Sequence, residues 1–195
     1  MAFDVLRWQK VSAASAADVM KGRNVMDGGL HAVRPEAVLA GPAFTVQILH
    51  DDVSFIFQAI REAERGSVLV VAGVRDDYAC VGEIMAAAAA ARGLGGLIVD
   101  GCIRDSSAIR GMDFPVFCRG TIPCTPQITV KGGRTQVPVT CGGVTVFPGD
   151  IVIADGDGVA VVPQNEAEEV RSLAIAKEQR DAQRKEEMVA AYGKL

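Results

Sequence analysis

The chain has 195 residues, of which 49% are hydrophobic and only 5% aromatic. This length predicts a single domain over residues 1–195, and the apolar content excludes general disorder. A formal net charge of −4 gives no basic surface for nucleic acid or an anionic membrane, so we expect neither as a partner. Because no secretion signal and no membrane-length apolar run is present, we expect a cytoplasmic protein.

The first half of the chain predicts helices that alternate with strands. Glycine and proline punctuation, together with hydrophobic periodicity, sets the expected boundaries. A helix closed by Gly66 is followed by a buried strand, and a helix with six consecutive alanines leads through Gly93 into the next one. A strand–helix–strand unit of this kind favours parallel pairing. The expected helices span 15–20, 53–65 and 84–92, and the expected strands span 43–49, 67–72 and 96–100.

The second half is richer in short β runs. A strand is predicted over 115–118, and residues 127–162 contain several runs separated by glycine turns, which is typical of a small β layer. Asn165 and Glu168 resemble a capping box at the start of a long helix over 166–192. The mixed charges of 177–187 indicate a solvated face or a subunit contact. The fold class is therefore α/β.

Several polar or reactive residues carry little functional signal. The five cysteines are odd in number and lack C-x-x-C spacing, which predicts buried free thiols rather than disulfides or a zinc site (Cys80, Cys102, Cys118, Cys124 and Cys141). His31 and His50 are too far apart to suggest zinc catalysis. Asp51-Asp52 is explained as a helix cap, and 155–158 as a hairpin turn rather than a calcium loop.

Two segments do suggest a ligand site. Gly82, Glu83, Ile84 and Met85 stand where a loop becomes a helix, and the free N–H groups of a helix start can hold a carboxylate or phosphate. Arg104-Asp105 follows a buried parallel strand. Arginine can clamp a carboxylate, and aspartate can ligate a hard divalent cation.

Either segment alone is compatible with a purely structural role. The predicted helix leads directly into the predicted strand, so the helix start and the strand end should lie at one edge of the sheet. That edge would combine an anion site, an arginine and an aspartate suited to a metal. No Walker or G-x-G-x-x-G pattern is present, so nucleotide binding has no support.

The same segments resemble the family of the regulator of ribonuclease activity A (RraA), which includes the 4-hydroxy-4-methyl-2-oxoglutarate aldolases. The likeness covers most of the chain and keeps the order of the motifs. It rests on 41–46, 79–83, 91–105, 114–117 and 155–163.

The resemblance implies a swivelling β/β/α domain that forms trimers or hexamers with active sites at subunit interfaces. It implies a lyase that uses Mg²⁺ or Mn²⁺ and releases pyruvate from a 2-oxo dicarboxylic acid, by aldol cleavage or by decarboxylation of oxaloacetate. By position, Gly82 to Met85 and Arg104 would bind the substrate. Arg104 and Asp105 would be catalytic, with Asp105 holding the metal mostly through its waters.

One position departs from the family pattern. Aldolase members carry an acidic residue three positions after the aspartate, whereas this chain has Ala108. The departure affects aldol cleavage more than decarboxylation, because decarboxylation removes no proton from a substrate hydroxyl. The family also borrows a carboxylate from a neighbouring subunit, for which Glu178, Glu186 and Glu187 are all candidates.

Two other functions remain open. The family's name implies a non-enzymatic inhibitor of ribonuclease E, and an acidic surface is compatible with a basic protein partner. A methyltransferase label has also been attached to such sequences. The missing glycine-rich nucleotide loop speaks against that reading.

Overall fold

The computed structural model describes residues 4, 7–8, 10–49, 51–126 and 132–193. His50 and Lys131, with the start of the expected β region at 127, lie outside these ranges. The helices are α1 (Ala13–Val19), α2 (Ser54–Glu62), α3 (Glu83–Arg92), α4 (Ser106–Arg110) and α5 (Ala167–Tyr192). The strands are β1 (His31–Ala32), β2 (Leu39–Ile48), β3 (Val68–Ala72), β4 (Ala79–Val81), β5 (Gly96–Ile103), β6 (Val116–Thr121), β7 (Gly133–Thr135), β8 (Val139–Cys141), β9 (Val144–Val146), β10 (Ile151–Asp155) and β11 (Gly158–Val162).

The described strands form one mixed nine-stranded sheet and a separate β8–β9 hairpin. The order along the large sheet is β1-β6-β5-β3-β2-β10-β11, while β4 pairs with β5 and β7 pairs with β2. Strands β2, β3, β5 and β6 are parallel, and β10 and β11 add antiparallel strands at one side. The expected parallel pairing of β3 with β5 is therefore confirmed.

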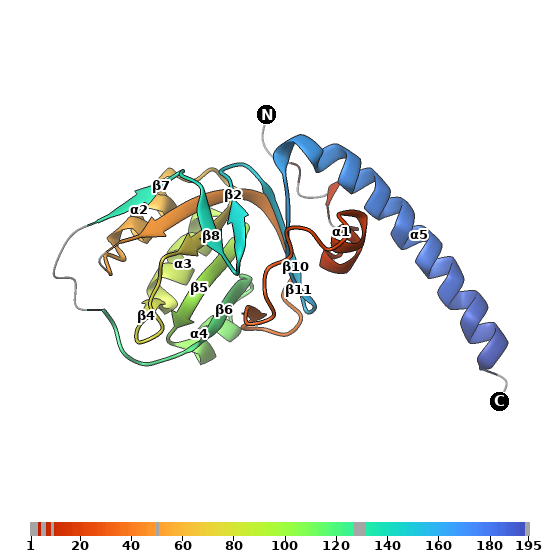
Figure 1. Ribbon diagram of the computed structural model, residues 1–195. Coiled ribbons are helices and arrows are strands. Elements are labelled where there is room, and N and C mark those ends of the chain that lie inside the picture. The colour runs from red at the N-terminus through yellow and green to blue at the C-terminus, as the bar shows by residue number, and fades with distance from the viewer. Residues whose placement is uncertain (1–3, 5–6, 9, 50, 127–131, 194–195) are drawn as a thin grey trace.

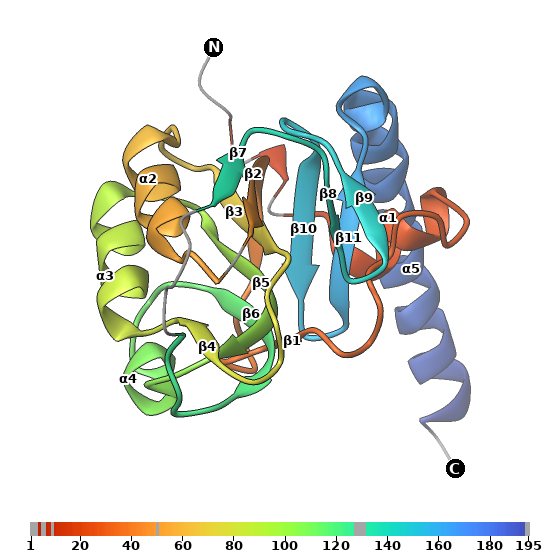
Figure 2. The same cartoon turned by 60° about the vertical axis from the view of Figure 1, so that its left-hand side comes forward.

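Helices and the small hairpin cover different parts of this sheet. Helices α2, α3 and α4 lie together over the parallel strands, and α1 and α5 lie beside β10 and β11 (Figure 2). The alanine tract lets α3 approach the sheet closely, since Ala86 and Ala89 are fully buried. Gly93 ends α3 with a φ of +77°, as its position predicts. The expected α/β fold with a mixed sheet, a small second sheet and a long C-terminal helix is confirmed.

Some expected boundaries were wrong for identifiable reasons. Strand β2 begins at Leu39, before the Gly41-Pro42 pair that predicted its start, because its first half pairs with β10 and its second half with β3. Helix α2 ends at Glu62, and the buried Ala63 already has an extended backbone. The predicted capping box is absent: the turn over Gln164–Glu166 is a 3₁₀ helix, and α5 starts without a side-chain cap.

The two ends of α5 have different surroundings. Val170 and Ala174, near its start, are buried with residues of α1 and the β10–β11 pair. From position 179 onward every described residue is exposed, and the helix extends away from the body of the protein (Figure 1). This agrees with the expected solvated face or subunit contact. Among the described residues, no helix combines the length and apolar character needed to span a membrane.

Arg119, on β6, forms ion pairs with Asp27 in the loop before β1 and with Asp100 on β5. Its guanidinium donates to both carboxylate oxygens of Asp27, at 2.9 and 2.8 Å, and its Nε donates to Asp100 at 2.5 Å. Asp100 also accepts a bond from the N–H of Gly142, which lies between β8 and β9. Hydrogen bonding from Arg119 lowers the pKa of Asp27 from 3.8 to about 2.

We expect Asp27→Asn to lower the free energy of unfolding at neutral pH by about 1 kcal/mol, since the ion pair is partly exposed and screened by solvent. The pKa of Asp27 is depressed on folding, so its contribution is complete above pH 3.8 and is lost as pH falls towards 2. Urea unfolding at pH 7 and pH 3 should show the variant's deficit shrinking at the lower pH. Asp113→Asn is the control, because Asp113 is 98% exposed in its pair with Arg34. Equal deficits in both variants would contradict the assignment.

Candidate active site at the carboxyl end of β5

The helix start and the strand end predicted from the sequence lie side by side. Strand β5 runs on to Ile103, beyond the expected end at Asp100, and β4 pairs with its last residues. The N–H of Arg104 donates to the carbonyl oxygen of Val81 at 2.9 Å. Because α3 begins two residues after Val81, this pairing brings the first turn of α3 against Arg104 and Asp105.

Asp105 contacts the helix directly. Its Oδ2 accepts a 3.1 Å hydrogen bond from the N–H of Glu83, the first residue of α3. The N–H groups in the first turn of a helix have no partner within the helix, so those of Ile84 and Met85 are available to an anionic ligand. The helix start thus both orients the carboxylate and keeps donors for a second anion.

Gly82 allows this close approach. A methyl group at its Cα would stand 2.7 Å from Asp105 Oδ2 and 3.1 Å from Arg104 Nε. Its φ of −135° is open to any residue, so the need for glycine here is one of space. The sequence had suggested an anion-binding role for this position, and the structure adds contact with both polar side chains.

Arg104 and Asp105 project into partly open surroundings. Their side chains are 43% and 42% exposed, and Arg104 Nε lies 3.6 Å from Asp105 Oδ2. Asp105 has a φ of +57°, in the left-handed region, where it ends β5's extension and starts α4. Aspartate tolerates this conformation better than most residues, although it still costs free energy. Such strain is common at functional sites.

A cavity of about 230 Å³ opens in front of these groups. It is lined by the first turn of α3, by Arg104 and Asp105, by β4, and by residues that the sequence reasoning missed. Val53 is the N-cap of α2, Phe57 lies within α2, and Thr125 and Pro126 follow β6. An apolar residue in a predicted helix is normally assigned to the core, so no sequence signal indicated that Val53 and Phe57 line a cavity.

The residues present fit a hydrated divalent cation. Within the described part of the chain, no three His, Cys, Asp or Glu side chains gather around one point. Mg²⁺ is commonly held by one or two carboxylates together with waters and substrate oxygens. Asp105 is a partly exposed carboxylate, and its Oδ1 accepts no hydrogen bond from the described residues. It can therefore serve as the protein's single ligand when a chelating substrate completes the set.

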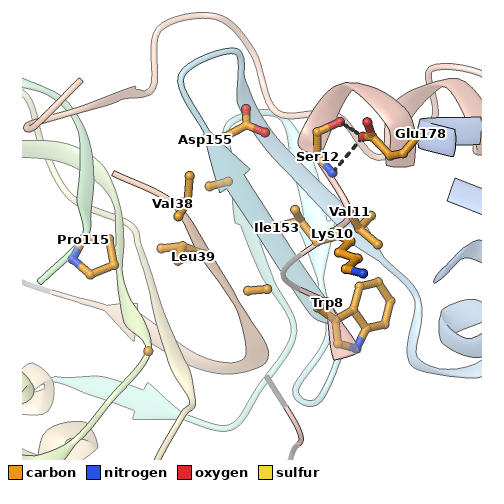
Figure 3. A pocket seen from close by; sticks show the side chains of 13 residues that line it. Trp8, Lys10, Val11, Ser12, Val38, Leu39, Pro115, Ile153, Asp155 and Glu178 are labelled. Atoms are coloured by element: carbon orange, nitrogen blue, oxygen red, sulfur yellow. Dashed lines mark hydrogen bonds between the residues drawn. The ribbon is translucent and has the colours of Figure 1, made fainter. Parts of the chain in front are cut away.

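Glu178, one of three candidates for a neighbouring site, is engaged within its own chain. Its Oε1 accepts bonds from the N–H and hydroxyl of Ser12 (Figure 3). It also accepts a bond from the hydroxyl of Ser15, and these hydrogen bonds lower the pKa of Glu178. It borders a separate hollow of about 500 Å³ that Asp155 also lines. Both carboxylates thus hold the start of α1, since Asp155 accepts from the N–H of Ala13. Glu186 and Glu187 lie on the exposed end of α5.

The remaining candidates keep structural roles. Burial raises the pKa of the Cys80 thiol to about 12, and the pKa of Cys102 is raised for the same reason, so neither is activated as a nucleophile. Asp52 accepts a bond from the N–H of Ser54, the first residue of α2, but the N-cap of this helix is Val53, which makes no side-chain cap bond. The prediction that Asp51-Asp52 caps the helix was therefore wrong in position. His31 is exposed in β1 and lies beside Cys118.

The fold and this cleft define an α/β protein in which the start of helix α3 lies beside an arginine–aspartate pair. The family model RraA-like (Aldolase/RraA) matches residues 13–161. The chain belongs to the RraA-like family.

Three proteins that are similar to this chain have names that describe different functions. A protein of Halalkalibacterium halodurans called "Putative 4-hydroxy-4-methyl-2-oxoglutarate aldolase" is 32% identical over 92% of this chain and 86% of its own length. RraAS2 of Streptomyces coelicolor, described as an unusual member of the RNase ES inhibitor RraA protein family, superimposes with a TM-score of 0.80 at 30% identity and covers 93% of this chain and 94% of that one. A Geobacillus kaustophilus structure described as an S-adenosylmethionine: 2-dimethylmenaquinone methyltransferase has a TM-score of 0.71 at 34% identity over 78% and 95%.

Gly82→Ala should separate site geometry from stability. The three atoms nearest to the new methyl group all belong to side chains, Asp105 Oδ2 and the Nε and Cγ of Arg104, so we expect an unfolding free energy within about 1 kcal/mol of the parent. Displacement of the Asp105 carboxylate should weaken Mn²⁺ binding at least tenfold, measured by the paramagnetic signal of free Mn²⁺. Gly28→Ala is the control, since its added methyl meets nothing within 4 Å. Unchanged Mn²⁺ affinity in Gly82→Ala would contradict the geometry.

Glu178→Gln should destabilise the protein, because it weakens charge-assisted hydrogen bonds that join α1 to α5. We expect a loss of about 2 kcal/mol in chemical unfolding. Glu186→Gln on the exposed end of the same helix should change stability by less than about 0.5 kcal/mol. Similar losses of unfolding free energy in both variants would contradict a stabilising role for the hydrogen bonds between Glu178 and α1.

Proposed function

We propose that this protein is a divalent-metal-dependent lyase that releases pyruvate from a 2-oxo dicarboxylic acid, by decarboxylation of oxaloacetate, by aldol cleavage of 4-hydroxy-4-methyl-2-oxoglutarate, or both. The observation that carries the proposal is the meeting of Arg104, Asp105 and the first turn of α3 around one cavity. The name of the Halalkalibacterium halodurans relative supports the same reaction class.

Each polar group that borders the cavity would have a different role in the proposed reaction. The N–H groups of Ile84 and Met85 would hold the carboxylate next to the keto group. Arg104 would donate to the negative charge that develops on the keto oxygen as the carbon–carbon bond breaks. Asp105, oriented by Glu83 N–H, would hold Mg²⁺ or Mn²⁺. When bound, that cation supplies Lewis-acid polarisation of the 2-oxo group.

Ala108 bears on which reaction is favoured. It lies on α4, one helical turn after Asp105, and presents a methyl group where aldolase relatives are expected to carry an acid. Aldol cleavage needs a base for the substrate's hydroxyl proton, whereas decarboxylation does not. We therefore propose decarboxylation as the stronger activity.

Assembly enters the proposal through α5. Its exposed second half ends in Met188, Val189 and Tyr192, each at least 48% exposed, which supports contact with another copy. We propose a homotrimer or hexamer in which a neighbouring subunit borders the cavity. The exposed second half of α5 could bring Glu186 or Glu187 to the cavity of a neighbouring subunit, since Glu178 is already hydrogen-bonded within its own chain.

Pyruvate release from oxaloacetate and from 4-hydroxy-4-methyl-2-oxoglutarate tests the proposal. We expect turnover that requires Mg²⁺ or Mn²⁺, disappears with chelator, and falls at least about a hundredfold in Asp105→Ala, since loss of a preorganised electrostatic group has effects of this size. Asp113→Ala, an exposed aspartate away from the cavity, is the control. Absence of metal-dependent turnover of either substrate would overturn the proposal.

Inhibition of a ribonuclease is the second candidate, and the likeness to RraAS2 favours it. It requires no metal and no intact Asp105. A pull-down with ribonuclease E and a cleavage assay would support it if the protein bound and inhibited while releasing no pyruvate.

A further inference from the structure

The lining of the cavity at the end of β5 has a polar part and an apolar part. The polar part comprises Arg104, Asp105 and the first N–H groups of α3. The apolar part, called the apolar wall below, comprises the side chains of Val53, the N-cap of α2, Phe57 of α2, and Ile84 and Met85 of α3. Among the described residues that line the cavity, Arg104 is the only cationic side chain. The apolar wall thus lines the cavity with hydrocarbon and thioether groups.

Ile84 is the unusual member of this wall. It is 75% exposed, whereas its neighbours Met85 and Ala86 in the first turn of α3 are buried. The core does not require an isoleucine at this position. Because Ile84 also lines the cavity, a molecule bound there would cover part of its exposed side chain.

An apolar wall discriminates between the two ends of a diacid. A carboxylate moved from water to an apolar surface without a donor loses hydration and gains nothing in return. Arg104 and the start of α3 can satisfy the carboxylate next to the keto group. A second carboxylate turned towards the wall would have no cation of this chain to pair with.

Building on the proposed function, we propose that the apolar wall of Val53, Phe57, Ile84 and Met85 determines specificity by disfavouring a second carboxylate that persists and favouring one that is lost. In oxaloacetate the bond between C3 and C4 breaks, its electron pair moves to give the enolate of pyruvate, and C4 leaves as neutral CO₂. Water then protonates C3 to give pyruvate. The charge that the wall disfavours disappears along this path.

The other substrate class behaves differently at the same wall. Aldol cleavage of 4-hydroxy-4-methyl-2-oxoglutarate yields two pyruvates, so its second carboxylate stays ionised from substrate to product. The wall then opposes binding and offers no gain as the bond breaks. The wall and Ala108 thus act in the same direction, through different contacts.

Binding of unreactive 2-oxo acids tests the wall apart from turnover. 2-Oxopentanoate and 2-oxoglutarate have five carbons each and differ at the far end, which is a methyl group in one and a carboxylate in the other. We expect calorimetry in the presence of Mg²⁺ to show at least about tenfold tighter binding of 2-oxopentanoate, given the cost of burying an unpaired polar group.

Two variants should reverse this preference by supplying a cation. Ile84→Lys places the charge at an exposed position that folding tolerates, and Phe57→Lys places it on α2. Each should raise the affinity for 2-oxoglutarate relative to 2-oxopentanoate by about tenfold or more. The controls Ala87→Lys and Gln58→Lys add the same charge to the same helices at positions that do not line the cavity, and should leave the ratio unchanged.

The outcomes separate this inference from the proposed function. Three results would overturn the inference that the apolar wall determines specificity. These are tighter binding of 2-oxoglutarate by the parent protein, equal shifts in variants and controls, and no binding of either acid. If metal-dependent pyruvate release accompanied any of them, the proposed lyase function would still hold. The expected order of affinities without any pyruvate release would support the wall as a selector and overturn the lyase.

Discussion

The pairing of β4 with the last residues of β5 is the constraint on which the rest of the site depends. It is short, and its anchor is the hydrogen bond from Arg104 N–H to the Val81 carbonyl oxygen. Because Gly82 follows Val81 and α3 follows Gly82, that bond places a helix start beside the strand end. Without it, the N–H groups of α3 and the carboxylate of Asp105 would be separate features of the surface, each explained by local structure. With it, the N-terminal end of the α3 dipole, the Arg104 guanidinium and the Asp105 carboxylate all border one cavity.

The same constraint explains why the local backbone is unusual. Asp105 must turn its carboxylate back towards Glu83 N–H while the chain leaves the sheet and enters α4, and it does so in the left-handed region. Gly82 must present no side chain to the space that this carboxylate occupies. The two residues are therefore coupled: the carboxylate of Asp105 occupies space that a side chain at position 82 would need, and Arg104 occupies the rest of that space. Packing of α3 by its alanine face supplies the rigidity that holds the arrangement.

Sequence reasoning reached the pair of segments because both have local signals. A helix start after glycine and a polar pair after a β-branched run can be read from a few residues, and the rule that such ends meet at one edge joins them. It could not reach the α2 side of the cavity, because Val53 and Phe57 look like core residues and only tertiary contact shows that they face a hollow. It also misplaced the ends of β2 and α2, where strand partners and burial of Ala63 override local punctuation. The role of Glu178 depended on Ser12 and Ser15, more than 160 positions away, and no local pattern announces such a contact.

The distribution of charge around the cavity connects the fold to chemistry. The charged groups of the lining, Arg104 and Asp105, come from the edge where β4, β5 and α3 end or begin, while α2 contributes the hydrocarbon of Phe57. In the proposed reaction, a bound substrate would meet charged groups at one end and apolar side chains at the other, so the reaction most assisted would be one whose charge moves towards Arg104. Loss of CO₂ does this, because the departing carbon becomes neutral as the keto oxygen gains charge.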